Sequence, residues 1–357
     1  MSDPAMRPSR RYLTMVVASI SLIALTCVAF LVPVPYVALS PGPAYDTLGE
    51  FDGEPMFTFG KDVKTYPTKG ALAFTSVRVT AARSNVSLAE AVEAYFAADT
   101  AVLPRSVIYR EDQSVKEAEQ EGAAQLTSSK DSSRVAALRA AGYTVPEMPT
   151  IDSVEPDAPA DGQLRKGDVI RTVDGRRAST AQDVVAAIGK LDPGDAVDVG
   201  FTRKGLEQSV EIVTRPNPEN KKEPRIGVSI RPRFDFPVEI ENHVGARIGG
   251  SSAGTMFALA IYDRLTPGPL TGGLKVAGTG TMAPDGSVGP IGGVAQKLVG
   301  AAAQGAKVFL VPEDNCDSAI KGDDRGMRLV KISTLDGAID ALEALAKDPK
   351  ASVPPCE

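Results

Sequence analysis

One long uncharged stretch near the start of the chain constrains what the rest of it can become. Residues 12–39 contain no charged side chain, and Met15 to Val32 are almost all apolar or small. At about 1.5 Å per helical residue, such a run can cross a hydrocarbon core of about 30 Å. The sequence therefore predicts a transmembrane helix over residues 12–35, followed by a separate folded body.

Basic residues flank this run on one side only. Three arginines precede it within residues 7–11, and no Lys or Arg follows until Lys61. By the positive-inside rule, residues 1–11 are expected in the cytoplasm and the main body outside it, on the far side of the cell membrane. A cleaved signal peptide is the alternative, but the apolar run is long for one and Pro41 makes the nearest candidate cleavage site a poor one.

Composition excludes several classes of function. The 357 residues carry 39 Lys and Arg against 45 Asp and Glu, so no basic surface for nucleic acid is expected. His243 is the single histidine, which excludes a zinc site with several His ligands and leaves one candidate for a Ser-His pair. No GxxxxGK[ST] loop occurs, so ATP is not expected to take part, and no metal or other cofactor is predicted.

The three cysteines suggest one covalent link. Cys27 lies in the apolar run, whereas Cys316 and Cys356 lie near the C-terminus without the spacing of a metal site. If the main body is outside the cytoplasm, a disulfide between these two can hold the C-terminal tail, residues 347–357. Two free thiols are the alternative, and the tail is then expected to be poorly ordered.

The segment between the apolar run and the middle of the chain, residues 40–120, gives local signals. Gly70 to Val79 alternates like a strand, and Ser87 to Phe96 has the pattern of a helix with a capping box. Glu111 to Ser133 is polar and charged, which indicates a mobile segment or a solvated helix, and a short helix is expected over Ser133–Gly142.

The middle of the chain contains two motifs of a small mixed domain, Asp157-Ala-Pro-Ala and Gly167-Asp-Val-Ile, the second followed by Val173-Asp-Gly. With them, residues 125–215 resemble a bacterial-type PDZ domain. The resemblance implies a small β-barrel or sandwich with helices that binds extended peptide ends by strand addition. No GLGF-like tetrapeptide stands where the carboxylate-binding loop is expected, so a structural or gating role is the alternative. Residues 216–224 are expected to form a hydrophilic linker.

Two elements of the C-terminal part carry chemistry. Ile248-Gly-Gly-Ser-Ser-Ala-Gly254 leads into an apolar helix, whose unpaired N–H groups can stabilise an oxyanion. Lys297 lies in a second apolar helix that follows a Gly-Gly pair; burial there would lower its pKa and leave a neutral amine that can act as a base. The alternatives are an ordinary N-cap cluster for the first element and a surface lysine for the second.

Together these elements resemble the proteolytic domain of Lon-type serine proteases (peptidase family S16), over residues 225–346. The resemblance assigns Ser252, before Ala-Gly, as the nucleophile and Lys297, four residues after the Gly-Gly pair, as the base. It also implies that Thr279 orients the lysine and that Gly250 and Ser251 belong to the oxyanion loop.

Two positions depart from the family pattern. Gly249 stands where many Lon-type enzymes carry an acidic residue, and Ser251 stands where Pro is usual. The strand over residues 70–79 resembles the first strand of the family, so the PDZ domain is expected to be inserted within a split protease domain.

The expected fold class is α+β: a transmembrane helix, a PDZ domain and a Lon-type α/β proteolytic domain. This order resembles the membrane-anchored PDZ-containing Lon-like proteases of bacteria, particularly Gram-positive and actinobacterial ones. The resemblance implies an ATP-independent serine endopeptidase that cleaves unfolded, membrane or secreted proteins outside the cytoplasm. It also implies a homo-oligomer, with a hexameric ring as the default. The alternative function is a cell-envelope scaffold with an inactive protease domain.

Overall fold

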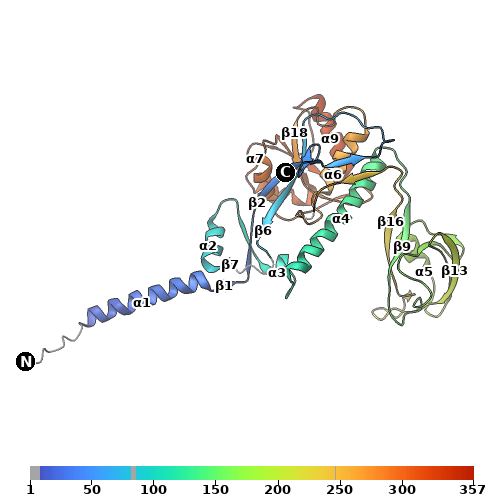
Figure 1. Ribbon diagram of the computed structural model, residues 1–357, viewed down its shortest axis with the longest axis horizontal. Coiled ribbons are helices and arrows are strands. Elements are labelled where there is room, and N and C mark those ends of the chain that lie inside the picture. Colours follow the sequence, from blue (N-terminus) through green and yellow to red (C-terminus); the bar gives the residue numbers. More distant parts are fainter. Residues whose placement is uncertain (1–8, 82–85, 246) are drawn as a thin grey trace, which may run out of the picture. The chain divides into compact units, whose positions relative to one another are not determined.

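The computed structural model describes residues 9–81, 86–245 and 247–357, and it divides into two compact units (Figure 1). Unit 1 comprises Met1–Ala141 and Ile240–Glu357, and unit 2 comprises Gly142–Glu239. Unit 2 is thus inserted into the chain of unit 1. Both units mix helices and strands, which confirms the expected α+β class.

Helix α1 (Arg10–Leu31) begins at Ser9, whose side chain accepts a hydrogen bond from the Tyr12 amide. Over Arg10–Phe30 it is long and apolar enough to cross a membrane, by length and composition alone. The helix predicted over 12–35 ends earlier, at Leu31. The helical conformation is unfavourable for Val32, the residue before a proline, and Pro33 already starts strand β1 (Pro33–Val34). Most of the predicted cytoplasmic segment, residues 1–8, lies outside the described residues.

Two short helices lie next to the segment that follows α1. Strand β1 pairs with β7 (Val86–Ser87), and α2 (Leu88–Phe96) starts there with a capping box between Ser87 and Glu90, as predicted. Strand β8 (Ala101–Pro104) leads directly into α3 (Arg105–Ile108).

The main sheet of unit 1 has the order β22-β21-β18-β6-β2-β8. The four strands from β22 to β6 run parallel, and β2 and β8 are antiparallel to their neighbours. Strand β6 matches the strand predicted over residues 70–79 to within one residue. The bounds are β2 Tyr36–Asp46, β6 Ala71–Val79, β18 Lys275–Gly278, β21 Val308–Pro312 and β22 Arg328–Ile332.

Helices cover both faces of this sheet, because successive strand residues point to opposite sides. On one face, Ala73 of β6 packs with α7 (Val294–Ala303) and α8 (Cys316–Ile320). On the other face, Phe74 contacts Phe257 of α6 (Gly254–Leu265), with ring centroids 5.4 Å apart. Helix α9 (Leu335–Lys347) packs beside α6.

Short elements complete unit 1. They are β3 Glu50–Phe51, β4 Glu54–Pro55, β5 Phe57–Phe59, β17 Ile240–Asn242, β19 Thr281–Met282, β20 Val288–Gly289 and the 3₁₀ turn Glu313–Asn315.

Helix α4 (Val115–Ala140) is a single long helix of unit 1 and packs against α6. From the sequence, this segment is expected to hold a polar stretch and, from residue 125, the start of the PDZ-like domain. The structure differs because the small side chains Ser129 and Ser133 are buried and face unit 1, while the insertion begins only at Gly142.

Unit 2 is built on a sheet of order β13-β12-β10-β9-β16, with α5 (Ala181–Ile188) packed on it. The predicted linker 216–224 is instead mostly a loop that joins β14 to β15, and β16 pairs with β9 from Val228↔Val154 to Phe234↔Glu147. The C-terminal domain therefore does not begin at residue 225. The bounds are β9 Glu147–Val154, β10 Val169–Val173, β11 Arg176–Arg177, β12 Ala196–Arg203, β13 Leu206–Val213, β14 Arg215–Pro216, β15 Pro224–Arg225 and β16 Val228–Phe234.

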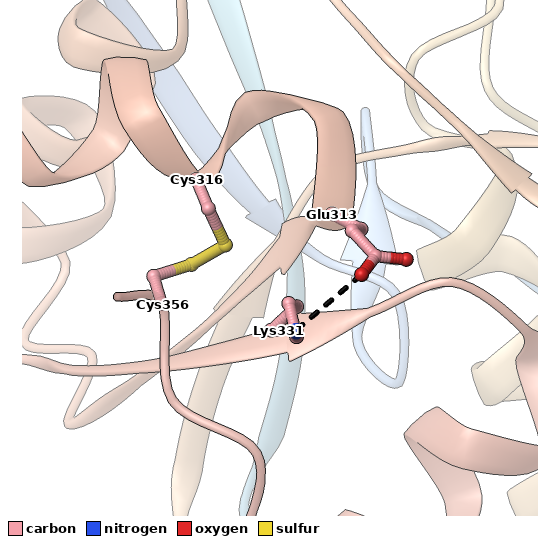
Figure 2. The surroundings of a disulfide bond; sticks show 4 residues. All are labelled: Glu313, Cys316, Lys331 and Cys356. Carbon is pink, nitrogen blue, oxygen red and sulfur yellow. Dashed lines mark ion pairs between the residues drawn. A yellow bond between two sulfur atoms is a disulfide. The ribbon is translucent and has the colours of Figure 1, made fainter.

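A disulfide joins Cys316 at the start of α8 to Cys356 in the C-terminal tail, with a Cα–Cα distance of 5.1 Å (Figure 2). The Lys331 amide of β22 donates to the Pro354 carbonyl at 2.8 Å, and Lys331 Nζ lies 3.3 Å from Glu313. The tail is therefore fixed along the edge strand of the main sheet.

Candidate active site

Close packing of α7 on β2 buries Lys297. A Cβ at Gly300 would lie 2.4 Å from the Gly42 carbonyl oxygen, so only glycine allows this approach. The helix starts after Gly293, whose φ of 69° is in the left-handed region. Lys297, one turn along, is 2% exposed and is among the largest fully buried side chains of the described residues.

Burial determines the charge state of this amine. Desolvation lowers the pKa of Lys297 from 10.5 to about 7, because an ammonium group loses its hydration in this position. Lys297 Nζ donates a hydrogen bond of 2.9 Å to Thr279 Oγ1. A neutral amine held in this way keeps a lone pair with which it can accept a proton.

Thr279 connects the amine to the backbone of Ser252. Its hydroxyl donates to the Ser252 carbonyl at 3.0 Å, and the Gly280 amide donates to the same oxygen at 2.9 Å. Gly280 has a φ of 151°, and a Cβ there would lie 2.4 Å from Thr255 Oγ1. The turn after β18 thus fixes Ser252 and Lys297 relative to each other through one threonine.

Ser252 and Lys297 line the same cavity, whose volume is about 370 Å³. Within the described part of the chain, no hydrogen bond joins Ser252 Oγ to Lys297 Nζ. In the same part of the chain, the amides of Ser252 and Ala253 donate to no protein acceptor. The other lining residues are Pro43, Tyr45, Phe74, Thr75, Ser76, Val77, Arg78, Val79, Arg247, Ile248, Gly249, Gly250 and Ala253.

Helix α4 holds the loop that carries Ser252. The Gly250 amide donates to the Gly122 carbonyl at 3.0 Å. Ser129 Oγ donates to the carbonyl of Ser251 at 3.1 Å. The single hydroxyl proton of Ser133 is shared between the carbonyls of Ser129, at 2.5 Å, and Gly254, at 2.8 Å. These hydrogen bonds hold the loop to α4 on both sides of Ser252.

This role of α4 was not predicted from the sequence. The one signal was the pair of serines four residues apart, which place two hydroxyls on one helix face. Lys130, next to them, donates to the carbonyls of Asn242 and Val244 at 2.9 and 2.7 Å, and partial burial lowers its pKa.

The two departures from the family pattern lie at this contact. A Cβ on Gly249 would meet the Gly122 Cα at 3.4 Å, so the backbone of α4 occupies the space next to this position. Ser251 presents its carbonyl to Ser129.

His243 lies elsewhere in unit 1. Its Nε2 is 2.9 Å from Thr58 Oγ1, and its ring lies near the carboxylates of Glu54 and Glu241. It does not line the cavity that contains Ser252.

Unit 2 contains a second cavity, of about 890 Å³, between α5 and the edge strand β16. Val185 and Ile188 line it from α5, and residues 223–230 line it from the other side. Where the chain enters β16, Ile226-Gly-Val-Ser resembles the GLGF-like tetrapeptide that was not identified from the sequence. Gly227 has a φ of 77°, and a Cβ there would lie 2.2 Å from that of Ala158.

Comparisons with known proteins identify both domains. The model of the PDZ domain matches residues 124–214, and that of the Lon protease (S16) C-terminal proteolytic domain matches residues 237–341. The chain therefore contains a PDZ domain and a Lon-type serine protease domain, which confirms both resemblances drawn from the sequence. The PDZ match covers the end of α4 and stops before β16, so it overlaps unit 2 without coinciding with it.

Two curated relatives match parts of the chain. Lon protease 2 of Bacillus subtilis is 32% identical over 120 residues, which cover 34% of this chain and 21% of the relative. A probable periplasmic serine endoprotease DegP-like of Halomonas elongata is 29% identical over 103 residues, which cover 26% of this chain and 22% of the relative. The chain thus spans about a fifth of the length of each relative.

Solved structures of PDZ domains are also similar. The PDZ domain of the SdrC-like protein from Listeria monocytogenes is 24% identical with a TM-score of 0.22, and the match covers 23% of this chain and 85% of that one. The corresponding domain from Listeria innocua is 25% identical with a TM-score of 0.22, over 24% of this chain and 93% of that one.

Proposed function

We propose that the protein is an ATP-independent serine endopeptidase in which Ser252 is the nucleophile and Lys297 the general base. The observation that carries this proposal is a buried lysine whose pKa is lowered to about 7 and which shares a cavity with the serine. The Lon-type domain match supports the reaction class.

The reaction would proceed through an acyl-enzyme. Ser252 Oγ attacks the scissile carbonyl carbon while Lys297 Nζ takes the hydroxyl proton. The amides of Ser252 and Ala253 would stabilise the oxyanion, and Gly250 and Ser251 would shape the loop that carries them. The Lys297 ammonium then protonates the leaving amine as the C–N bond breaks, and water hydrolyses the ester by the same route. Thr279 keeps the amine oriented throughout.

Unit 2 would hold polypeptide segments for this site. A strand at the edge of a sheet has unpaired backbone groups, and an extended peptide can pair with β16 while its side chains contact α5. The loop formed by Arg225, Ile226 and Gly227 would receive the terminal carboxylate. The apolar, 65% exposed side chain of Val185 supports an apolar contact there.

The proposed location is the extracytoplasmic face of the cell membrane, with α1 as a single-pass anchor and its N-terminus in the cytoplasm. The Cys316–Cys356 disulfide supports this side, because disulfides persist in oxidising compartments. Residues 40–357 would then all lie outside. A homo-oligomer, with a hexameric ring as the default, is proposed on the resemblance to Lon-type domains alone.

Cleavage of an unfolded protein by the full chain in detergent tests the activity, with and without ATP. The wild type should cleave at the same rate in both conditions, and Ser252→Ala and Lys297→Met should reduce cleavage to background. Ser251→Ala and Lys307→Met are matched controls that should retain activity. Full activity in the first pair would refute the dyad, and an inactive wild type that still binds peptide would favour the scaffold function.

A further inference from the structure

The two short helices α2 and α3, which lie beside the residues that follow α1 (Figure 1), carry large exposed apolar side chains. We call this set the α2/α3 patch. It consists of Leu88, Val92, Tyr95 and Phe96 of α2, and Val107 and Ile108 of α3. Phe96 is 79% exposed, Tyr95 72% and Val107 64%. Side chains of this size are seldom gathered on a water-exposed surface without a partner.

The sequence of α2 gathers its large apolar residues on one face. Leu88, Val92, Tyr95 and Phe96 are spaced i, i+4, i+7 and i+8, which places them along a single stripe. Glu90 and Glu93 lie on the opposite side, and the small Ala91 packs inward. The helix therefore has the character of an amphipathic segment whose apolar face is turned away from the body of unit 1.

Hydrogen bonds tie both helices to the residues that directly follow α1. Strand β7, immediately before α2, pairs with β1, with Ser87 opposite Pro33. The Arg105 amide, at the start of α3, donates to the Pro35 carbonyl at 2.9 Å. The patch is thus held beside the C-terminal end of α1 by two separate backbone contacts.

Simple lengths place this end of α1 at a membrane surface if α1 spans it. The 21 residues of the candidate span cover about 32 Å at 1.5 Å per residue, close to a hydrocarbon core of about 30 Å. Pro33 follows Leu31 by two residues, hence by at most about 7 Å. The paired strand β7 lies about 5 Å to the side of β1, so Ser87 is at most about 12 Å from Leu31, next to a headgroup region about 5–8 Å deep.

We propose that the α2/α3 patch inserts into the interfacial layer of the lipid bilayer beside the outer end of α1. Tyr and Phe with a flanking apolar stripe suit this layer, where aromatic rings are enriched and amphipathic helices lie in the membrane plane. The patch then holds unit 1 against the membrane at a second point besides the anchor. The inference rests on the proposed anchoring by α1.

Tryptophan fluorescence tests the proposal, because the chain contains no Trp. The full chain with Phe96→Trp is placed in nanodiscs with and without phospholipid brominated in the upper acyl chain. We expect bromine to quench its emission roughly twofold or more, with a blue-shifted maximum. Tyr95→Trp, at the neighbouring exposed position, provides a second reporter if the first variant folds poorly.

Two single-Trp controls separate this proposal from the anchor itself. Phe30→Trp reports insertion of α1, and Leu206→Trp reports an exposed turn-side position of unit 2 that should not be quenched. Quenching of Phe30→Trp without quenching at positions 95 and 96 would overturn the patch proposal and leave the anchor intact. Loss of quenching at Phe30→Trp would overturn the anchor and the patch together.

A second copy of the chain is the other occupant that the experiment can detect. In that case the Phe96→Trp emission would be blue-shifted but insensitive to bromine, and it would shift to the red on dilution of the protein. This result would overturn the membrane assignment.

Discussion

Replacing Lys297 by methionine is expected to stabilise unit 1 while it removes activity. Methionine has a similar length and no charge to desolvate. The pKa of Lys297 is lowered to about 7 in the folded chain, whereas an unfolded lysine titrates near 10.5. Between these two values the unfolded state binds more protons, so the stability of the wild type rises with pH over this window.

The size of the effect follows from the shift. At 1.36 kcal/mol per pKa unit, the buried lysine costs about 4 kcal/mol at pH 7 and about 2 kcal/mol at pH 9. Loss of the hydrogen bond to Thr279 removes about 1 kcal/mol. Lys297→Met should therefore stabilise the fold by about 3 kcal/mol at pH 7 and about 1 kcal/mol at pH 9.

Thermal unfolding of the full chain in detergent measures this difference at both pH values. One kcal/mol corresponds to a shift of about 2–4 °C in a body of this size. Lys307→Met, the same change at an exposed lysine, is the control and should show no pH-dependent shift. A variant that is less stable than the wild type at both pH values, or a difference independent of pH, would refute the assignment of a desolvated amine.

Three further predictions concern the parts around the dyad. Ser133→Ala removes the hydrogen bond to the Gly254 carbonyl and should lower kcat about tenfold with little change in KM. The control Thr127→Ala loses only a hydrogen bond within α4 and should keep its kcat. Equal effects of the two substitutions would show that α4 does not position the loop. Gly227→Ala should weaken binding of a labelled peptide with a free C-terminus about tenfold, measured by fluorescence anisotropy, because the added Cβ meets Ala158. Gly205→Ala, at a similar φ of 83° but with open space around it, is the control; unchanged affinity of Gly227→Ala would argue against the groove. Cys356→Ser should lower the free energy of unfolding by about 4 kcal/mol, because the disulfide closes a loop of 40 residues. Cys27→Ser, which changes a free cysteine, should leave the free energy of unfolding unchanged. A denaturation midpoint of Cys356→Ser equal to that of the wild type would contradict a structural disulfide.

The features that sequence could predict are those with local signals. The apolar run, the capping box of α2 and the alternation of β6 each depend on residues a few positions apart, and the structure contains all three. The two glycine-rich motifs, around Ser252 and Lys297, lie far apart in the sequence, but each is similar enough to the Lon-type pattern to be recognised without the other. The cavity then contains both Ser252 and Lys297.

The features that sequence could not predict depend on distant partners. In the sequence, Ser133 ends a polar stretch that indicates a solvated helix, because its acceptor, the carbonyl of Gly254, lies 121 residues away. Strand β16 was assigned to the next domain because its partner β9 lies at the N-terminal end of unit 2, far from β16 in the sequence. For the same reason no carboxylate-binding loop was predicted at Gly227.

Labelling of Ser252 by a serine-directed phosphonate tests the central claim most directly. Mass spectrometry locates the adduct, and the labelling rate is followed from pH 5 to pH 9. We predict an adduct on Ser252 whose rate rises with pH through about 7, as Lys297 loses its proton, and which is lost in Lys297→Met but kept in Ser251→Ala. An adduct on another residue, or a rate unchanged by Lys297→Met, would contradict the dyad.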